Sequence, residues 1–196
     1  MLFRSRYCES RISIQYPLIE LANASSYLVL YIVTGLTIEF FFLALLTSIL
    51  LTIAAIDIKQ QIIPDSLVIS IFLLTVIYRA ASYFLYADTM NLKEGILGAL
   101  LGLIVFLLIV LVSRGGMGGG DVTLITVLGF ILGWRDLLVC TLLSFLIGAI
   151  ISITLLISGI KTRKDPIPFG PFLIIGFYLS YFFGNEIISY YYGILL

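Results

Sequence analysis

The sequence predicts an all-α protein, a polytopic bundle of about seven transmembrane helices. Three observations support this: 61% of the 196 residues are hydrophobic, only 11% are charged, and the mean hydropathy is +1.19. Soluble domains contain about 25% charged and about 45–50% apolar residues, and a soluble fold of this length could not bury so much apolar surface. We therefore expect most of the surface to face lipid.

The scarce charged residues divide the chain into uncharged runs, each of which predicts one span. The runs cover residues 21–38, 40–56, 66–86 with Arg79 inside, 95–113, 122–134, 137–160 and 166–185. A helix needs about 20 residues to cross the hydrocarbon core, so the fifth run is short. Either the glycines before it enter the membrane or Asp121 lies below the headgroups, and in both cases Asp121 is expected to be at least partly buried. In the fourth run, Gly98 and Gly102 form a G-x-x-x-G pattern that favours close helix packing.

The basic residues predict the orientation of these spans. With seven spans, the N-terminus and the loops after spans two, four and six share one side. That side holds eight of the eleven basic residues, namely Arg4, Arg6, Arg11, Lys59, Arg114, Lys161, Arg163 and Lys164. The positive-inside rule then places the N-terminus in the cytoplasm. The 11 basic and 11 acidic residues cancel, so we expect no nucleic acid as a partner.

The residue types present limit the expected chemistry to carboxylates. Histidine is absent, which excludes Ser-His and Cys-His triads and the commonest zinc ligand. Asp57 ends the second predicted span and Asp121 begins the fifth, so both are expected at the cytoplasmic face. Two close carboxylates can share a proton, and one can activate water while the other donates to a carbonyl. Asp121 lies at a helix N-terminus, where the dipole favours an anion, and Asp57 lies at a helix C-terminus, where the dipole disfavours one. We therefore expect Asp57 to carry that proton and Asp121 to be ionised.

The segments beside the two aspartates predict loops that could contact a substrate. Five glycines surround Met117 ahead of Asp121, and we interpret this run as a loop that lets a peptide lie close to backbone groups. The alternative is a flexible linker with Asp121 as a helix cap. Asp65, after Pro64, is interpreted first as the cap of the third span.

Three motifs in this order resemble the type IV prepilin peptidase family: Asp57 followed by Ile63-Pro64-Asp65, then Gly118-x-Gly120-Asp121, then Ile167-Pro168-Phe169-Gly170-Pro171. The resemblance implies a GxGD-type aspartic protease of the bacterial inner membrane, with Asp57 and Asp121 catalytic on the cytoplasmic side. It implies a type IV prepilin or type II secretion pseudopilin as substrate, cut between a short basic leader and an apolar helix. The expected substrate-binding or loop positions are Gly118, Gly119, Gly120, Pro64, Asp65, Pro168 and Gly170.

The N-terminal residues 1–18 resemble the end of that family's cytoplasmic domain, and residues 19–196 are predicted to form the transmembrane peptidase domain. In the family a four-cysteine zinc element precedes a Tyr-Pro-Leu-x-Glu segment. Here Ser5 stands where one cysteine is expected, and Cys8 alone cannot hold tetrahedral zinc. The resemblance links N-methylation by S-adenosylmethionine to that upstream region. We therefore predict that the peptidase uses no metal ion or cofactor. Zinc and S-adenosylmethionine are expected only where the cytoplasmic domain is present.

Two other functions remain open from the sequence. A presenilin-type intramembrane protease shares Gly-x-Gly-Asp, although its Tyr-Asp motif and Pro-Ala-Leu segment are not in this sequence. A small ion-coupled or proton-coupled transporter could use Asp57 and Asp121 as ion sites, because acids within membranes commonly mark ion pathways. Cleavage of a prepilin distinguishes the peptidase from the transporter.

Overall fold

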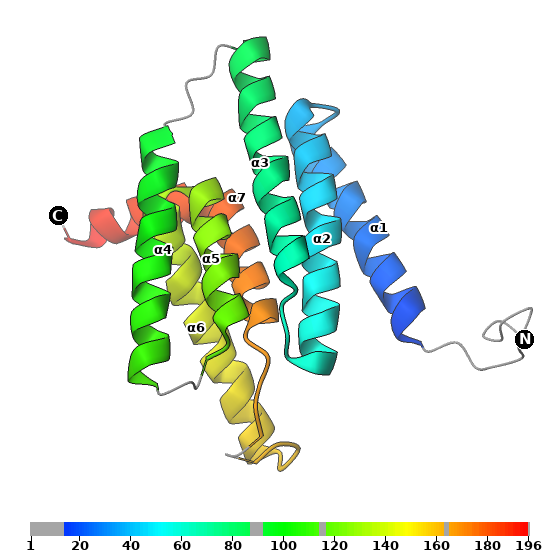
Figure 1. Ribbon diagram of the computed structural model, residues 1–196, viewed down its shortest axis with the longest axis vertical. Coiled ribbons are helices and arrows are strands. Elements are labelled where there is room, and N and C mark those ends of the chain that lie inside the picture. Colours follow the sequence, from blue (N-terminus) through cyan, green and yellow to red (C-terminus); the bar gives the residue numbers. More distant parts are fainter. Residues whose placement is uncertain (1–13, 87–91, 114–116, 163–164, 196) are drawn as a thin grey trace, which may run out of the picture.

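The computed structural model describes residues 14–86, 92–113, 117–162 and 165–195, and these residues form seven α-helices (Figure 1). The helices are α1 (Gln15–Thr34), α2 (Ile38–Gln60), α3 (Asp65–Tyr86), α4 (Leu92–Val112), α5 (Gly119–Leu132), α6 (Trp134–Ile157) and α7 (Gly170–Leu195). All except α5 are long and apolar enough to cross a membrane. The prediction of a polytopic helical bundle with a short fifth helix is therefore confirmed.

The ends of several helices differ from the uncharged runs, because glycine and proline end a helix more strictly than charge does. α1 ends before Gly35, whose φ is 66° and whose N–H donates to the carbonyl of Tyr31. α7 begins at Gly170 and not at 166, since Pro166 and Pro168 lack N–H groups and restrict the preceding backbone. The predicted bounds of the first and last spans were therefore wrong at both ends, most of all at the end of α7, which continues to Leu195 and not to 185.

The packing of the helices places α5 at the centre of the bundle. α5 contacts α3, α4, α6 and α7, whereas α1 packs against α2 at the edge (Figure 1). The C-terminal ends of α2, α4 and α6 lie at the same lower end of the bundle as the N-terminal end of α1. This alternation agrees with the predicted sequence of crossings, and it brings the end of α2 and the start of α5 to one side.

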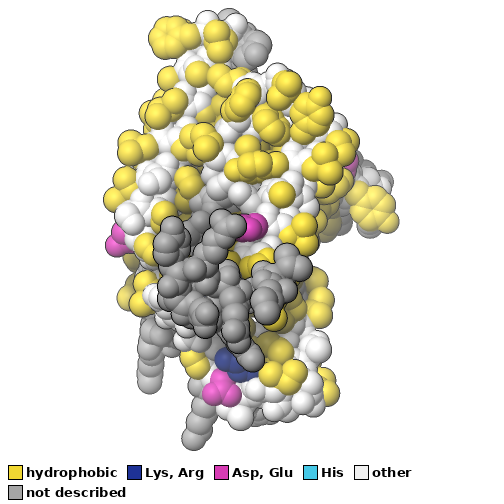
Figure 2. All heavy atoms as spheres, turned by 90° about the vertical axis from the view of Figure 1, so that its right-hand side faces the viewer, with side chains coloured by type: hydrophobic (Ala, Val, Ile, Leu, Met, Phe, Trp, Pro, Cys, Tyr) yellow, Lys and Arg dark blue, Asp and Glu magenta, His cyan; other side chains and the backbone are white. Residues whose placement is uncertain are grey.

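The surface and the core have the distribution expected of a membrane protein. Leu124, Ile125 and Leu128 of α5 are fully buried, while large hydrophobic side chains are exposed on all the long helices. Figure 2 shows hydrophobic side chains spread over one face, with few charged side chains among them. Such a surface is stable only in contact with lipid.

The contact between α4 and α5 depends on glycine. A Cβ atom at Gly98 would overlap the carbonyl group of Gly129, and one at Gly102 would lie 3.1 Å from the carbonyl oxygen of Ile125. Small residues let two membrane helices approach this closely. The predicted packing role of the G-x-x-x-G pattern is therefore confirmed.

Arg79 lies within α3 and binds the C-terminal end of α5. Its Nη2 donates to the carbonyl oxygens of Phe130 at 2.5 Å and Ile131 at 3.5 Å, and the guanidinium lies 4.7 Å from the centre of the Phe130 ring. The last carbonyls of a helix have no partner within the helix, and a cation there also interacts favourably with the helix dipole. Arg79 thus satisfies the end of a helix too short to reach the far surface.

Replacement of Arg79 by methionine is expected to lower the thermal unfolding midpoint of the protein in detergent. The substitution removes the donor to Phe130, and a buried carbonyl without a partner costs about 1–3 kcal/mol. Arg135→Met is the matched control, because Arg135 is exposed and also lies over an aromatic ring, that of Trp134. Equal midpoints for Arg79→Met and the unmodified protein would contradict this role.

Candidate active site

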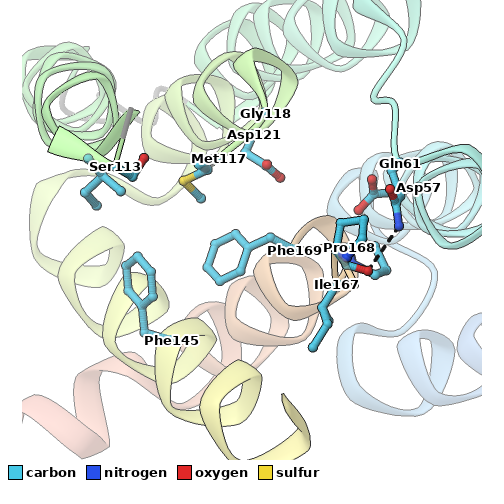
Figure 3. Close-up of a pocket in the computed structure, with 12 residues that line it drawn as sticks. Asp57, Gln61, Ser113, Met117, Gly118, Asp121, Phe145, Ile167, Pro168 and Phe169 are labelled. Atoms are coloured by element: carbon cyan, nitrogen blue, oxygen red, sulfur yellow. Dashed lines mark hydrogen bonds between the residues drawn. The ribbon is translucent and has the colours of Figure 1, made fainter. Parts of the chain in front are cut away.

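A cavity of about 430 Å³ opens where α2 and α4 end and α5 and α7 begin (Figure 3). Its polar wall includes Asp57, Gln61, Ser113 and Asp121, and its apolar wall includes Met117, Phe145 and Phe169. The cavity therefore joins two acids to an apolar surface large enough to receive a side chain.

The two predicted aspartates face this cavity from different helices. Asp57 is 5% exposed and Asp121 is 8% exposed, and in Figure 3 the two carboxyl groups point toward one another across the cavity. No Cα atom of α2 lies within 8 Å of a Cα atom of α5. The carboxyl groups therefore meet across a gap between helices that do not pack on each other.

Asp57 is held by the N-terminal end of α7. The backbone N–H of Gly170 donates to Asp57 Oδ2 at 2.9 Å, and a Cβ atom at Gly170 would lie only 2.7 Å from that oxygen. A helix N-terminus presents free N–H groups and a positive dipole end, both of which stabilise an anion. The sequence-based proton assignment compared the C-terminal dipole of α2 at Asp57 with the N-terminal dipole of α5 at Asp121, and the end of α7 opposes the dipole of α2. The end of α2 alone therefore does not locate the shared proton.

Asp121 lies in the first turn of α5, lines the cavity and has one carboxyl oxygen without a hydrogen-bond partner in the described part of the chain. A Cβ atom at Gly118 would lie 3.3 Å from Asp121 Oδ2, so the backbone approaches the carboxylate closely there. Asp121 Oδ1 is buried and has no hydrogen-bond partner among the described residues. Buried polar atoms are nearly always satisfied in folded proteins, so an unsatisfied one beside a cavity suits a ligand-binding role.

The other predicted site residues divide into those at the cavity and those behind it. Gly118 and Pro168 line the cavity. Gly120 packs against the α2–α3 loop, because a Cβ atom there would lie 2.7 Å from Cβ of Ile63, the residue before Pro64. This contact brings the loop against the start of α5. Pro64 belongs to this loop and does not line the cavity.

Two of the predicted positions do not reach the cavity. Gly119 has open space around it, with no atom within 4 Å of a Cβ built there. Asp65 is exposed and is the first residue of α3, while the Pro64 carbonyl accepts the first hydrogen bonds of that helix. Pro64 therefore occupies the capping position that the sequence suggested for Asp65.

Several residues of the cavity were not found from the sequence. Gln61 follows Asp57 by one helical turn, a spacing that could have drawn attention to it. Phe145 gives no such signal, because it lies in the middle of an apolar run. Only the packing of α6 places its ring beside that of Phe169, with 5.1 Å between the two ring centres.

The prediction about zinc in the N-terminal segment concerns residues that the structure does not describe, whereas residues 15–18 of that segment begin α1. Ser5 and Cys8 precede residue 14, where the description begins, and the first two glycines of the run before Asp121 also lie outside it. Among the described residues, no group of three His, Cys, Asp or Glu side chains could hold a metal ion. The zinc prediction therefore stays a prediction.

Comparison with known proteins identifies the family. The sequence profile of the type IV leader peptidase family matches residues 44–153, which include both aspartates. The chain belongs to the type IV leader peptidase family. A member of this family is a membrane peptidase, which favours that function over the transporter. No solved structure matches the chain.

Curated relatives of this leader peptidase extend the similarity over nearly its whole length. Proteins named prepilin leader peptidase/N-methyltransferase are 34% identical in Bacillus subtilis (strain 168), 34% in Legionella pneumophila and 36% in Pseudomonas aeruginosa. The alignments cover 97%, 97% and 92% of this chain. The chain spans 76%, 66% and 62% of the three relatives, so each relative also contains residues without a counterpart here.

Replacement of Gly170 by alanine is expected to lower the peptidase activity by up to about 100-fold, because a misplacement of about 1 Å at a reacting group can cost that much. The added Cβ would displace Asp57 Oδ2, from which it would lie 2.7 Å away. Gly119→Ala is the matched control, since it adds the same methyl group in open space beside Asp121. Initial rates of peptide cleavage by the detergent-solubilised proteins test this, and equal losses in both variants would contradict it.

Proposed function

We propose that this chain is an aspartic endopeptidase that removes the basic leader of type IV prepilins or pseudopilins at the cytoplasmic face of the bacterial inner membrane. One observation carries the proposal: two aspartates distant in sequence, Asp57 and Asp121, face one cavity in a chain of the leader peptidase family. The name of the relatives, prepilin leader peptidase/N-methyltransferase, supports the substrate class.

The proposed reaction uses one proton shared by the two carboxyl groups. The ionised aspartate accepts a proton from a water molecule, whose oxygen then attacks the carbonyl carbon of the scissile peptide. The protonated aspartate donates to the carbonyl oxygen. As the tetrahedral intermediate collapses, the C–N bond breaks, the amine nitrogen takes a proton from one carboxyl group, and a hydroxyl of the intermediate returns its proton to the other, which restores the singly protonated pair. The apparent titration then belongs to the pair, so we assign the resting proton to neither residue alone.

The surroundings of the cavity support cleavage near the membrane surface. Lys59 and Lys161 lie at the same end of the bundle, and an excess of basic residues marks the cytoplasmic side. Phe145 lines the cavity and is 39% exposed, so the cavity presents an apolar side chain at its opening. An apolar substrate helix could thus remain in the bilayer while its basic leader stays in water. We propose lateral entry of the substrate on this basis.

Peptide hydrolysis by two carboxyl groups needs no further group. We therefore propose that neither a metal ion nor an organic cofactor takes part in cleavage. The relatives' name pairs the peptidase with an N-methyltransferase, a separate reaction for which S-adenosylmethionine would supply the methyl group.

Asp57→Asn and Asp121→Asn are each expected to reduce cleavage of a prepilin by about 10²–10⁴-fold, the usual contribution of a general acid or base. An amide cannot exchange the required proton, although it keeps the size of the carboxyl group. The assay follows release of the leader from a prepilin with a Gly-Phe junction in detergent, by the mass of the products.

Asp136→Asn is the matched control for these two variants. Asp136 is also a partly buried aspartate with a buried, unsatisfied oxygen, but it lies at the opposite end of the bundle, in the first turn of α6. Full cleavage by either the Asp57 or the Asp121 variant would contradict the dyad. Aspartate-dependent ion flux into vesicles without any cleavage would favour the transporter.

A further inference from the structure

The backbone of Gln61 has a conformation that glutamine rarely adopts. Its φ and ψ are 56° and 38°, in the left-handed region, and it is the only non-glycine residue with positive φ among those described. Helices often end in this conformation, but the residue is usually glycine or asparagine, because a Cβ atom is crowded there. A strained residue in the wall of an active-site cavity suggests that its side chain has a function.

The side chain of Gln61 connects α2 to the segment before α7. Its Nε2 donates to the carbonyl oxygen of Pro166 at 3.1 Å, shown by the dashed line in Figure 3. Its backbone N–H donates to the carbonyl oxygen of Asp57 at 2.8 Å. The left-handed turn thus ends the helix one turn after Asp57 and directs the amide toward Pro166.

This hydrogen bond holds one end of a short segment whose other end binds Asp57. Pro166 begins the segment, and Gly170, which ends it, donates its N–H to Asp57 Oδ2 at 2.9 Å. Residues 166–170 are therefore attached to α2 at two points. Lys161 Nζ also lies 3.4 Å from the Pro166 oxygen, but Lys161 belongs to the same connection between α6 and α7 and does not bind it to α2.

We propose that Gln61 is a positioning residue of the peptidase. By holding the Pro166 carbonyl, it fixes residues 166–170 against the end of α2 and keeps the Gly170 N–H on the Asp57 carboxylate. This inference rests on the proposed catalytic role of Asp57. It assigns to Gln61 an effect on the reactivity of Asp57, and no direct contact with the reacting peptide.

Gln61→Leu is expected to lower kcat for prepilin cleavage by about tenfold with little change in KM, since one hydrogen bond between neutral groups is lost. Gln61→Gly should show a similar loss, although glycine relaxes the left-handed backbone and should not lower the thermal unfolding midpoint. Gln61→Lys restores a long side chain with a donor and should recover most of kcat. Gln60→Leu is the matched control, because Gln60 is the exposed neighbour and should keep the activity.

A double variant tests whether Gln61 acts through Gly170. If both residues position Asp57 by one linkage, Gln61→Leu should cause little additional loss in a Gly170→Ala background. Losses that multiply would contradict a shared linkage.

Three outcomes would separate this inference from the proposed function. Unchanged kcat in Gln61→Leu, with Asp57→Asn inactive, would overturn the positioning role and leave the aspartic mechanism standing. A higher KM with unchanged kcat would also overturn it, in favour of direct substrate contact. Full activity of Asp57→Asn would instead contradict the proposed function itself.

Discussion

The hydrogen bond from the Gly170 N–H to the Asp57 carboxylate connects the end of α2 to the start of α7, and the site depends on it. It bridges 113 positions of sequence and brings the Pro-rich segment against the cavity. Only glycine leaves room for the carboxylate at this distance. The positive end of α7 also opposes the unfavourable dipole of α2 at Asp57. The start of α7 thereby stabilises the Asp57 carboxylate at the end of α2, a position where the dipole of α2 alone would disfavour it.

The second aspartate depends on a different arrangement, the placement of a short helix at the centre of the bundle. α5 has 14 residues and contacts four other helices, including α4, which it meets at a glycine crossing. Arg79 binds the carbonyls at its far end, inside the bundle. Because α5 is supported at that end, its N-terminus with Asp121 can lie at the cavity. If α5 were longer, its last carbonyls would not lie inside the bundle and would not need Arg79 as a donor.

Much of this arrangement could be predicted from the sequence, because charges are scarce and each has a reason for its place. The helical bundle, the short α5, the glycine packing and the meeting of Asp57 with Asp121 all follow from spacing and alternation. The predicted end of the first span and the predicted start of the last span were wrong, because the positions of charged residues do not reveal the backbone conformation at Gly35 and Gly170. The role of Gln61 could not be predicted, because it depends on a left-handed turn and on a carbonyl distant in sequence.

The pH dependence of kcat/KM for prepilin cleavage shows whether Asp57 and Asp121 react as a pair that shares one proton. Such a pair is active only in its singly protonated state, so the account predicts a bell-shaped profile whose two limbs belong to the dyad. Loss of the pair in Asp57→Asn or Asp121→Asn should leave residual activity without that profile. A profile with a single limb in the unmodified protein, or a bell retained in either variant, would contradict the account.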